Sequence, residues 1–204
     1  MSDDRFPFVA ILRGVGPDEV VAHARALAAQ RFAAVEVPTN SPAWSESVRR
    51  LAAAVPDGPE IGAGTVLNLE DVDALAATGA RLMVTPNTDV EVVRRAKDKG
   101  LRALVGAMTP SEALAAVAAG ADALKIFPAS VVGPGFARIL KAVLPREVPL
   151  YAVGGITAAS LGQYAGGGWA GFGLGGELYR PGQSVADTEA KAAAFRRAWE
   201  DLPR

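Results

Sequence analysis

The strongest candidate for a catalytic residue in this sequence is a lysine that has apolar neighbours on both sides. Lys125 lies in the run ALKIFP, residues 123–128, which is typical of a buried strand. A free lysine, with a pKa near ~10.4, is protonated at neutral pH, but burial disfavours that charged form. An uncharged amine attacks a ketone to give an iminium, which accepts the electrons of a breaking C–C bond. Lys125 is therefore predicted to be a Schiff-base nucleophile.

Two further charged residues lie in similar apolar runs and would complete such a site. Glu36 lies in AVEVP, residues 34–38, and Arg13 ends VAILR, residues 9–13. Because side chains alternate along a strand, Glu36 and Lys125 would both turn away from their apolar neighbours and toward one interior. Glu36 would move protons, directly or through a water, and Arg13 would lower the lysine pKa further. The alternatives are an internal Lys125–Glu36 salt bridge and an Arg13 that is simply exposed.

The elements that must position these residues form a regular alternation of strand-like and helix-like segments, which implies parallel strands joined by helical crossovers. Strands are predicted at Phe8–Arg13, Ala34–Pro38, Glu60–Val66, Leu82–Pro86, Arg102–Ala107, Ala123–Phe127, Pro149–Val153 and Ala170–Leu174. Helical patterns start near Pro17, Ala43, Leu69, Asp89, Pro110, Gly135, Thr157 and Val185.

Eight compact units favour a closed (β/α)₈ barrel of the TIM type, an α/β fold in which residues 1–204 form one compact domain. An open doubly wound sheet is the alternative. Against it, Gly14-Val15-Gly16 lacks the full G-x-G-x-x-G pattern, and no ribose-binding carboxylate follows. Gly79, Gly100 and Gly120 each stand where a left-handed residue would end a helix. Barrel enzymes place their chemistry at the carboxyl ends of the strands, where Arg13, Glu36 and Lys125 all lie.

Glycine clusters follow the last two predicted strands. They are Gly154-Gly155 and the segment Gly171–Gly176. Loops at these two places often bind phosphate through bare backbone N–H groups, although tight turns alone would also require glycine. A third glycine-rich segment, Gly62–Thr65, is either a narrow passage with a hydroxyl at its end or a set of small residues that packs the barrel centre.

Composition excludes several classes of function. The chain has no cysteine, which removes disulfides, thiolate zinc sites and a cysteine nucleophile. The one histidine, His23, is predicted to be a solvated helix residue, so no transition metal is expected. The 21 Lys and Arg balance 22 Asp and Glu, which gives no basic field for nucleic acid. The apolar runs are shorter than the roughly 20 residues of a membrane span. A soluble, cytoplasmic protein without a metal or cofactor is expected.

From about Val9 to Tyr179 the sequence resembles the 2-keto-3-deoxy-6-phosphogluconate and -galactonate aldolase family. The shared motifs are ILRG at 11–14, VEVPTNSP at 35–42, IGAGTVL at 61–67, VTPN at 84–87, LKIFPAS at 124–130 and AVGGI at 152–156. The resemblance implies a class I aldolase, a carbon–carbon lyase without metal that yields pyruvate and glyceraldehyde 3-phosphate. It also implies a homotrimer.

The same resemblance implies roles for individual residues. The Schiff-base lysine falls on Lys125 and the acid/base glutamate on Glu36. Pyruvate-side contacts fall on Arg13 and Thr65. Phosphate contacts fall on Gly154, Gly155, Gly175 and Gly176, and further substrate-binding positions are Asn40, Pro86, Phe127 and Val153.

Two positions indicate the galactonate branch. Family members that act on the gluconate carry an arginine four residues after the glutamate and a threonine before the Gly-Gly pair, whereas this chain has Asn40 and Val153, as the galactonate enzymes do. The two substrates differ at the C4 hydroxyl, which threonine can hydrogen-bond and valine cannot. Two departures from the pattern are Gly176, where a serine is usual, and Thr39, where a leucine is usual; the sequence gives no account of Thr39.

The predicted reaction is therefore cleavage of 2-dehydro-3-deoxy-6-phosphogalactonate. The alternatives are the gluconate epimer as principal substrate, an aldolase for both epimers, and a non-catalytic barrel that binds a phosphorylated sugar acid. The choice between galactonate degradation and an Entner–Doudoroff role stays open. So does the trimer interface, because Trp44 and Trp169 could each belong to the core or to a contact between subunits.

Overall fold

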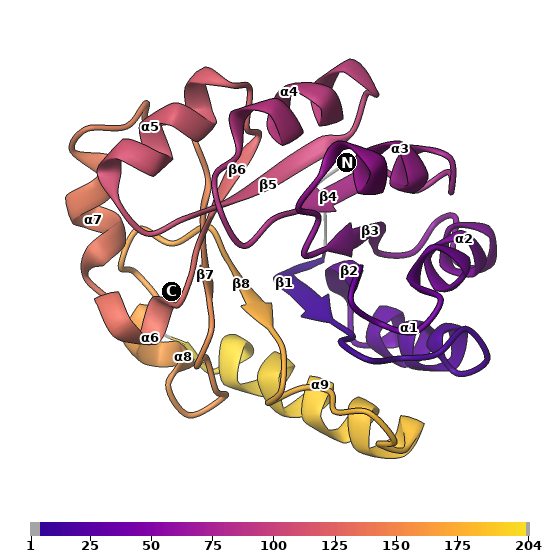
Figure 1. The fold of residues 1–204 in the computed structure, drawn as a ribbon. Helices are drawn as coiled ribbons and strands as arrows, with labels where there is room; N and C mark the ends of the chain where they lie inside the picture. The colour runs from indigo at the N-terminus through magenta and orange to yellow at the C-terminus, as the bar shows by residue number, and fades with distance from the viewer. Residues whose placement is uncertain (1–4, 203–204) are drawn as a thin grey trace.

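The structure, a computed structural model that describes residues 5–202, is a closed barrel of eight parallel strands, which confirms the barrel over the open sheet. Each strand pairs with the next along the chain, and β8 pairs with β1. Figure 1 shows the strands at the centre and the helices around them. The strands are β1 (Phe6–Ile11), β2 (Phe32–Pro38), β3 (Glu60–Gly64), β4 (Leu82–Val84), β5 (Arg102–Ala107), β6 (Ala123–Ile126), β7 (Leu150–Val153) and β8 (Gly171–Leu174).

The helices lie at or shortly after the predicted starts, and one further short helix is present. They are α1 (Val20–Ala29), α2 (Trp44–Ala54), α3 (Leu69–Ala76), α4 (Val90–Asp98), α5 (Pro110–Ala118), α6 (Ala129–Val132), α7 (Phe136–Lys141), α8 (Leu161–Tyr164) and α9 (Val185–Glu200). The sequence did not predict α6, a single turn after β6; α1 begins three residues later than expected, and α8 begins four residues later. Gly79, Gly100 and Gly120 have φ of +83°, +72° and +104° and end their helices as predicted.

Four predicted strands extend too far at their carboxyl ends. β1 ends two residues before Arg13, β3 one before Thr65, β4 two before Pro86, and β6 one before Phe127. These four residues therefore belong to loops at the carboxyl end of the barrel. An apolar or β-branched residue continues a strand pattern in sequence, but here the chain leaves the ladder of backbone hydrogen bonds and crosses the barrel mouth.

Apolar side chains pack in two separate layers. The larger cluster fills the space between strands and helices, and both Trp44 and Trp169 pack at its edge. A smaller cluster lies inside the barrel and comprises Val9, Ala34, Leu82, Val84, Leu104 and Ala123, with Tyr151 against it. Ala34 and Ala123 precede Glu36 and Lys125 by two positions on the same strands. The inner cluster therefore fills the barrel on the amino-terminal side of the two charged residues.

The prediction of a solvated His23 is wrong. The side chain is 1% exposed, its Nδ1 lies 2.9 Å from Thr188 Oγ1, and its ring meets Tyr179 edge to face at 4.9 Å. Helix α9 lies along α1 and covers this face (Figure 1). The pattern of α1 alone could not reveal a partner 165 residues away in sequence.

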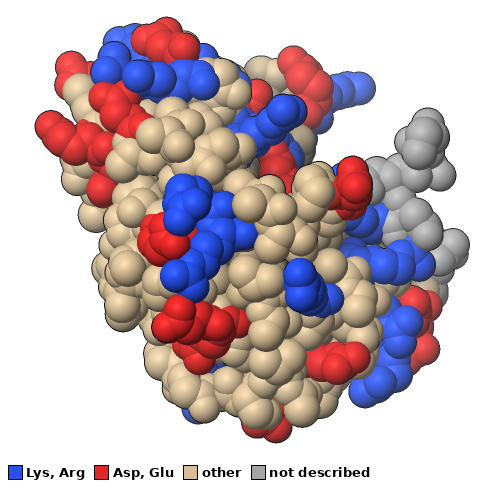
Figure 2. Space-filling model, turned by 90° about the vertical axis from the view of Figure 1, so that its right-hand side faces the viewer, with Lys and Arg blue, Asp and Glu red and all other residues tan. Residues whose placement is uncertain are grey.

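The surface carries charges of both signs. On the face drawn in Figure 2, basic and acidic side chains lie next to one another in small mixed groups, and uncharged surface separates these groups. Within residues 5–202, none of the helices has the length and apolar character to cross a bilayer. The same residues contain no group of three or more His, Cys, Asp and Glu side chains placed to hold a metal ion.

Candidate active site

Lys125 and Glu36 both point into the barrel, as strand alternation predicts. Their neighbours Leu124, Ile126 and Val35 belong to the outer apolar cluster. Lys125 is 5% exposed and Glu36 is 1% exposed. An amine and a carboxyl group are thus held together in an apolar interior toward the carboxyl ends of β6 and β2, the end at which barrel enzymes carry out chemistry.

The carboxyl group of Glu36 occupies space that only a glycine on β3 leaves open. A Cβ on Gly64 would lie 2.1 Å from Glu36 Oε2, and a Cβ on Gly62 would lie 2.0 Å from the carbonyl oxygen of Leu82. Of the two interpretations of this segment, close packing accounts for Gly62, whereas Gly64 leaves room for the carboxyl group of Glu36. No side chain at position 64 could be accommodated without moving Glu36.

Burial raises the pKa of Glu36 to about 7, although Lys125, Arg13 and the backbone N–H of Gly64 act to lower it. Its Oε2 is buried and, among the described residues, has no hydrogen-bond partner. A buried oxygen without a partner is costly unless it is protonated or meets a ligand. Glu36 can therefore hold or release a proton near neutral pH, which is what a general acid/base requires.

Burial also lowers the pKa of Lys125; Glu36 opposes this effect and Arg13 adds to it. The Nζ lies 5.3 Å from the centre of the Phe127 ring. Within the described residues no ion pair of 4.0 Å or less joins Lys125 to Glu36, so the alternative of a closed internal salt bridge is not observed. Both side chains are instead biased toward their neutral forms, and a neutral amine is the nucleophilic form of lysine.

Arg13 is exposed, but it is not free. Its Nη1 donates to Asn40 Oδ1 at 2.5 Å, and its Nη2 donates to Thr65 Oγ1 at 3.4 Å. These residues follow β1, β2 and β3, and the two hydrogen bonds hold the guanidinium group in place at the barrel mouth. Three predicted substrate-binding residues are thus brought together, around a positive charge suited to a carboxylate.

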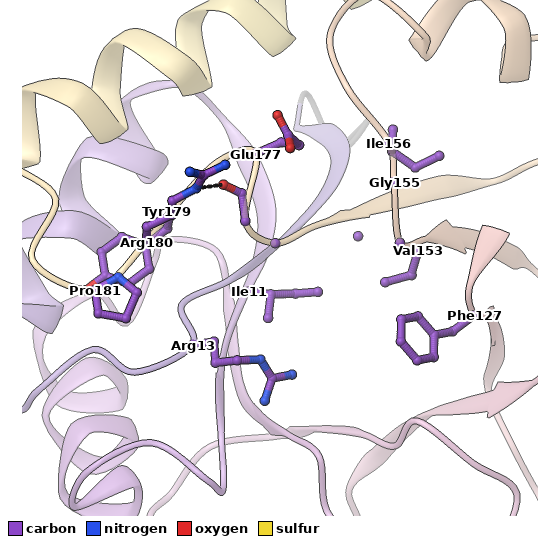
Figure 3. A pocket seen from close by; sticks show the side chains of 14 residues that line it. Ile11, Arg13, Phe127, Val153, Gly155, Ile156, Glu177, Tyr179, Arg180 and Pro181 are labelled. Atoms are coloured by element: carbon purple, nitrogen blue, oxygen red, sulfur yellow. Dashed lines mark hydrogen bonds between the residues drawn. The ribbon is translucent and has the colours of Figure 1, made fainter. Parts of the chain in front are cut away.

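A cavity of about 450 Å³ opens beside this cluster (Figure 3). In the figure Ile11 and Arg13 lie across the cavity from Val153 and Phe127. Seven predicted substrate-binding residues line it: Arg13, Phe127, Val153, Gly154, Gly155, Gly175 and Gly176.

The two glycine pairs in the cavity wall differ in what requires them. Gly154 and Gly155 have φ of +93° and +78°, and a Cβ on Gly154 would lie 3.1 Å from the Phe127 ring, so turn geometry accounts for both. A Cβ on Gly175 or Gly176 would meet nothing within 4 Å, and neither has a positive φ. Turn geometry therefore does not explain Gly175 and Gly176. Glycines here leave the backbone uncovered at the cavity wall, and backbone N–H groups of this kind suit a phosphate.

The other predicted residues lie outside the cavity wall. Lys125 and Glu36 lie in the barrel interior, while Asn40 and Thr65 reach the site through Arg13. Pro86 packs on β5, where a Cβ on Gly106 would lie 2.2 Å from its carbonyl carbon, and Gly106 pairs with Lys125.

Sequence reasoning missed six lining residues. They are Ile11, Ile156, Glu177, Tyr179, Arg180 and Pro181, whereas Gly173 belongs to the glycine cluster that the sequence predicted. Strand alternation could have found Ile11, which lies two residues before Arg13. Arg180 is the second cation in the wall, and its Nε donates to the Gly176 carbonyl at 3.0 Å, the dashed line in Figure 3. The sequence could have indicated Arg180 only by its position four residues after Gly176, the last glycine of the cluster.

Comparisons with known proteins point in one direction. Residues 4–183 match the family described as Aldolase: KDPG and KHG aldolase. The 2-dehydro-3-deoxy-6-phosphogalactonate aldolase of Escherichia coli K12 is 50% identical over 97% of this chain and 96% of its own length. The 2-dehydro-3-deoxy-phosphogluconate aldolase of Pseudomonas aeruginosa is 31% identical over 72% of this chain and 66% of its own. A solved structure described as native KDPGal superposes with a TM-score of 0.93 at 50% identity, covering 96% of this chain and 95% of that one.

Proposed function

This chain belongs to the KDPG and KHG aldolase family, and we propose from that premise that it cleaves 2-dehydro-3-deoxy-6-phosphogalactonate to pyruvate and glyceraldehyde 3-phosphate. The observation that carries the proposal is the buried pair of Lys125 and Glu36, whose ionisation is shifted toward the neutral forms. The 50% identity to a galactonate-type relative supports this choice of substrate over the gluconate epimer, whose relative is 31% identical.

The proposed reaction proceeds through a Schiff base. The neutral amine of Lys125 adds to the C2 ketone, and loss of water gives an iminium. A base removes the proton of the C4 hydroxyl, the C3–C4 bond breaks, and its electron pair moves into the iminium to leave an enamine. Glyceraldehyde 3-phosphate departs. Protonation of the enamine at C3 and hydrolysis then release pyruvate and the free lysine. Glu36 carries the protons, directly or through a water.

The two ends of the substrate meet different groups in this proposal. The carboxylate lies against the guanidinium of Arg13 and the hydroxyl of Thr65, which are already joined by a hydrogen bond. The phosphate lies against the backbone of Gly154, Gly155 and the 175–176 pair. Because Gly176 offers no hydroxyl, the backbone and the nearby Arg180 must stabilise the phosphate dianion.

Epimer preference tests the proposed substrate. We expect kcat/KM to be higher for the 6-phosphogalactonate substrate than for its gluconate epimer, because the methyl groups of Val153 line the cavity where threonine could bind the C4 hydroxyl. Val153→Thr should raise kcat/KM on the gluconate epimer by about tenfold, the effect of one hydrogen bond to a substrate hydroxyl. Val153→Ala, which changes the volume without adding a hydroxyl, is the control.

A wild-type preference above tenfold for the gluconate epimer would contradict the proposed substrate and favour the second enzyme alternative. The non-catalytic alternative is tested separately by borohydride reduction in the presence of pyruvate. An aldolase of this type gains the mass of a reduced pyruvate adduct on Lys125, whereas a protein that only binds sugar acids gains none.

We further propose that the protein is a cytoplasmic homotrimer. The trimer rests on the resemblance to the family, and the apolar side chains of Val131, Ile139 and Val143, which are 67%, 70% and 55% exposed, offer surface for subunit contact. We expect light scattering to give three times the chain mass of 21.0 kDa; the mass of one chain would contradict this.

The cytoplasm is proposed because a phosphorylated sugar acid crosses an apolar bilayer poorly, and recovery in a membrane or periplasmic fraction would contradict it.

A further inference from the structure

Thr65 has a backbone conformation that its residue type does not favour. Its φ is +56°, in the left-handed region, where β-branched residues are rarely found. Such a conformation persists only where the surrounding structure holds it, and it is found most often at functional sites. Thr65 follows β3, and its hydroxyl accepts a hydrogen bond from Arg13. Some neighbouring group must therefore fix its backbone.

Thr39 supplies that contact. Its Oγ1 donates to the carbonyl oxygen of Thr65 at 2.7 Å, and its backbone N–H donates to the carbonyl oxygen of Gly64 at 2.8 Å. The backbone bond continues the pairing of β2 with β3 by one residue, which any residue except proline could do. The side-chain bond requires a hydroxyl. A leucine at this position, which the resemblance to the family implies as the usual residue, would have no donor for it.

We propose that Thr39 is a positioning residue for the keto-acid carboxylate. Its hydroxyl holds the left-handed backbone of Thr65, and this places the Thr65 hydroxyl against the guanidinium of Arg13 at the barrel mouth. The inference rests on the proposed function, in which Arg13 and Thr65 bind the carboxylate. Thr39 itself touches no reacting atom, so its contribution lies in how firmly the keto acid is bound.

The test compares Thr39→Val, which removes the hydroxyl at nearly constant volume, with Thr39→Ser, which keeps it. The readout is the pyruvate concentration that half-saturates borohydride trapping on Lys125, together with KM and kcat for the phosphorylated substrate. We expect Thr39→Val to raise both the half-saturating concentration and KM by about tenfold, with a smaller change in kcat, as loss of an oriented hydrogen bond implies. Thr39→Ser should stay within about twofold of the wild type.

Thr78→Val is the control, because Thr78 Oγ1 donates to the Leu75 carbonyl at the same 2.7 Å but lies after α3, outside the site. Thr78 Oγ1 also accepts from the backbone N–H of Ala80 at 3.2 Å, so Thr78→Val should lower Tm at least as much as Thr39→Val and leave KM unchanged. If Thr39→Val is too unstable to assay, Thr39→Leu, which also lacks a hydroxyl, provides the same measurement.

The outcomes separate the two proposals. Wild-type protein that gains no mass with pyruvate overturns the proposed function, and this inference with it. Wild-type protein that is trapped normally, with Thr39→Val half-saturated at the wild-type concentration, overturns the role of Thr39 alone. A Thr39→Ser protein as impaired as Thr39→Val would also overturn it, since the hydroxyl would then not be the determinant.

Discussion

Lys125→Ala protein incubated with pyruvate and borohydride gains no covalent mass, and its turnover falls by at least about 10⁴-fold, the order of loss seen when a covalent nucleophile is removed. The expectation follows from the setting of the amine. Lys125 is 5% exposed, and burial lowers its pKa, so it is the lysine whose neutral form the structure favours. Trapping and turnover should be lost together, because the proposed reaction has no route that avoids the iminium.

Lys125→Met distinguishes loss of the nucleophile from loss of packing. Methionine fills most of the volume of the lysine stem but has no amine, so Tm should stay near the wild-type value, whereas alanine leaves a cavity and lowers it. Lys141→Met, which removes a half-buried amine at the end of α7 that donates to the carbonyls of Arg146 and Val148, should be trapped like the wild type. A Lys125→Met protein that still forms a pyruvate adduct would show that another amine is the nucleophile.

The fold was predictable because a parallel barrel repeats one local pattern. All eight strands appear where apolar runs stand in the sequence, and β5 has the predicted bounds. The predictions were wrong where contacts between distant parts of the chain determine burial or where an element is very short. His23 is buried by α9, a helix far along the chain, and the single turn of α6 has too few residues to show helical periodicity. Strand ends were extended because a strand and the first residues of a loop share the same residue types.

The candidate site was predictable to the extent that a charged residue is anomalous in a buried strand. Lys125 and Glu36 stood out in this way, and the structure brings them into one interior. Glu177 and Arg180 had no comparable signal, because charged residues are ordinary in a loop and only the folded loop places these two in the cavity wall. The contact from Thr39 to Thr65 was equally hidden, since it depends on a left-handed backbone that threonine seldom adopts.

Glu36→Gln is expected to reduce turnover by about 10²- to 10⁴-fold, the usual contribution of a positioned acid or base. The amide keeps the size of the carboxyl group beside Gly64 but cannot exchange protons. Pyruvate should still be trapped on Lys125, more slowly, because water can complete imine formation. Glu147→Gln, an exposed position outside the site, is the control. Unchanged turnover in Glu36→Gln would remove Glu36 from the mechanism.

The same variant has a stability signature whose sign follows from the Glu36 pKa. Burial raises it from 4.5 to about 7, so the folded state keeps the proton at pH values where the unfolded chain has lost it. Stability from this group is fully present below pH 4.5 and is lost as pH rises through 7. Glu36→Gln has no such group, so near pH 8 it should be more stable than the wild type by up to about 3 kcal/mol, with little difference near pH 4.5. Denaturant titrations at the two pH values measure the difference. If Glu36→Gln were equally more stable than the wild type at both pH values, ionisation of Glu36 would not destabilise the folded protein. The argument that Glu36 exchanges a proton near neutral pH would then fail.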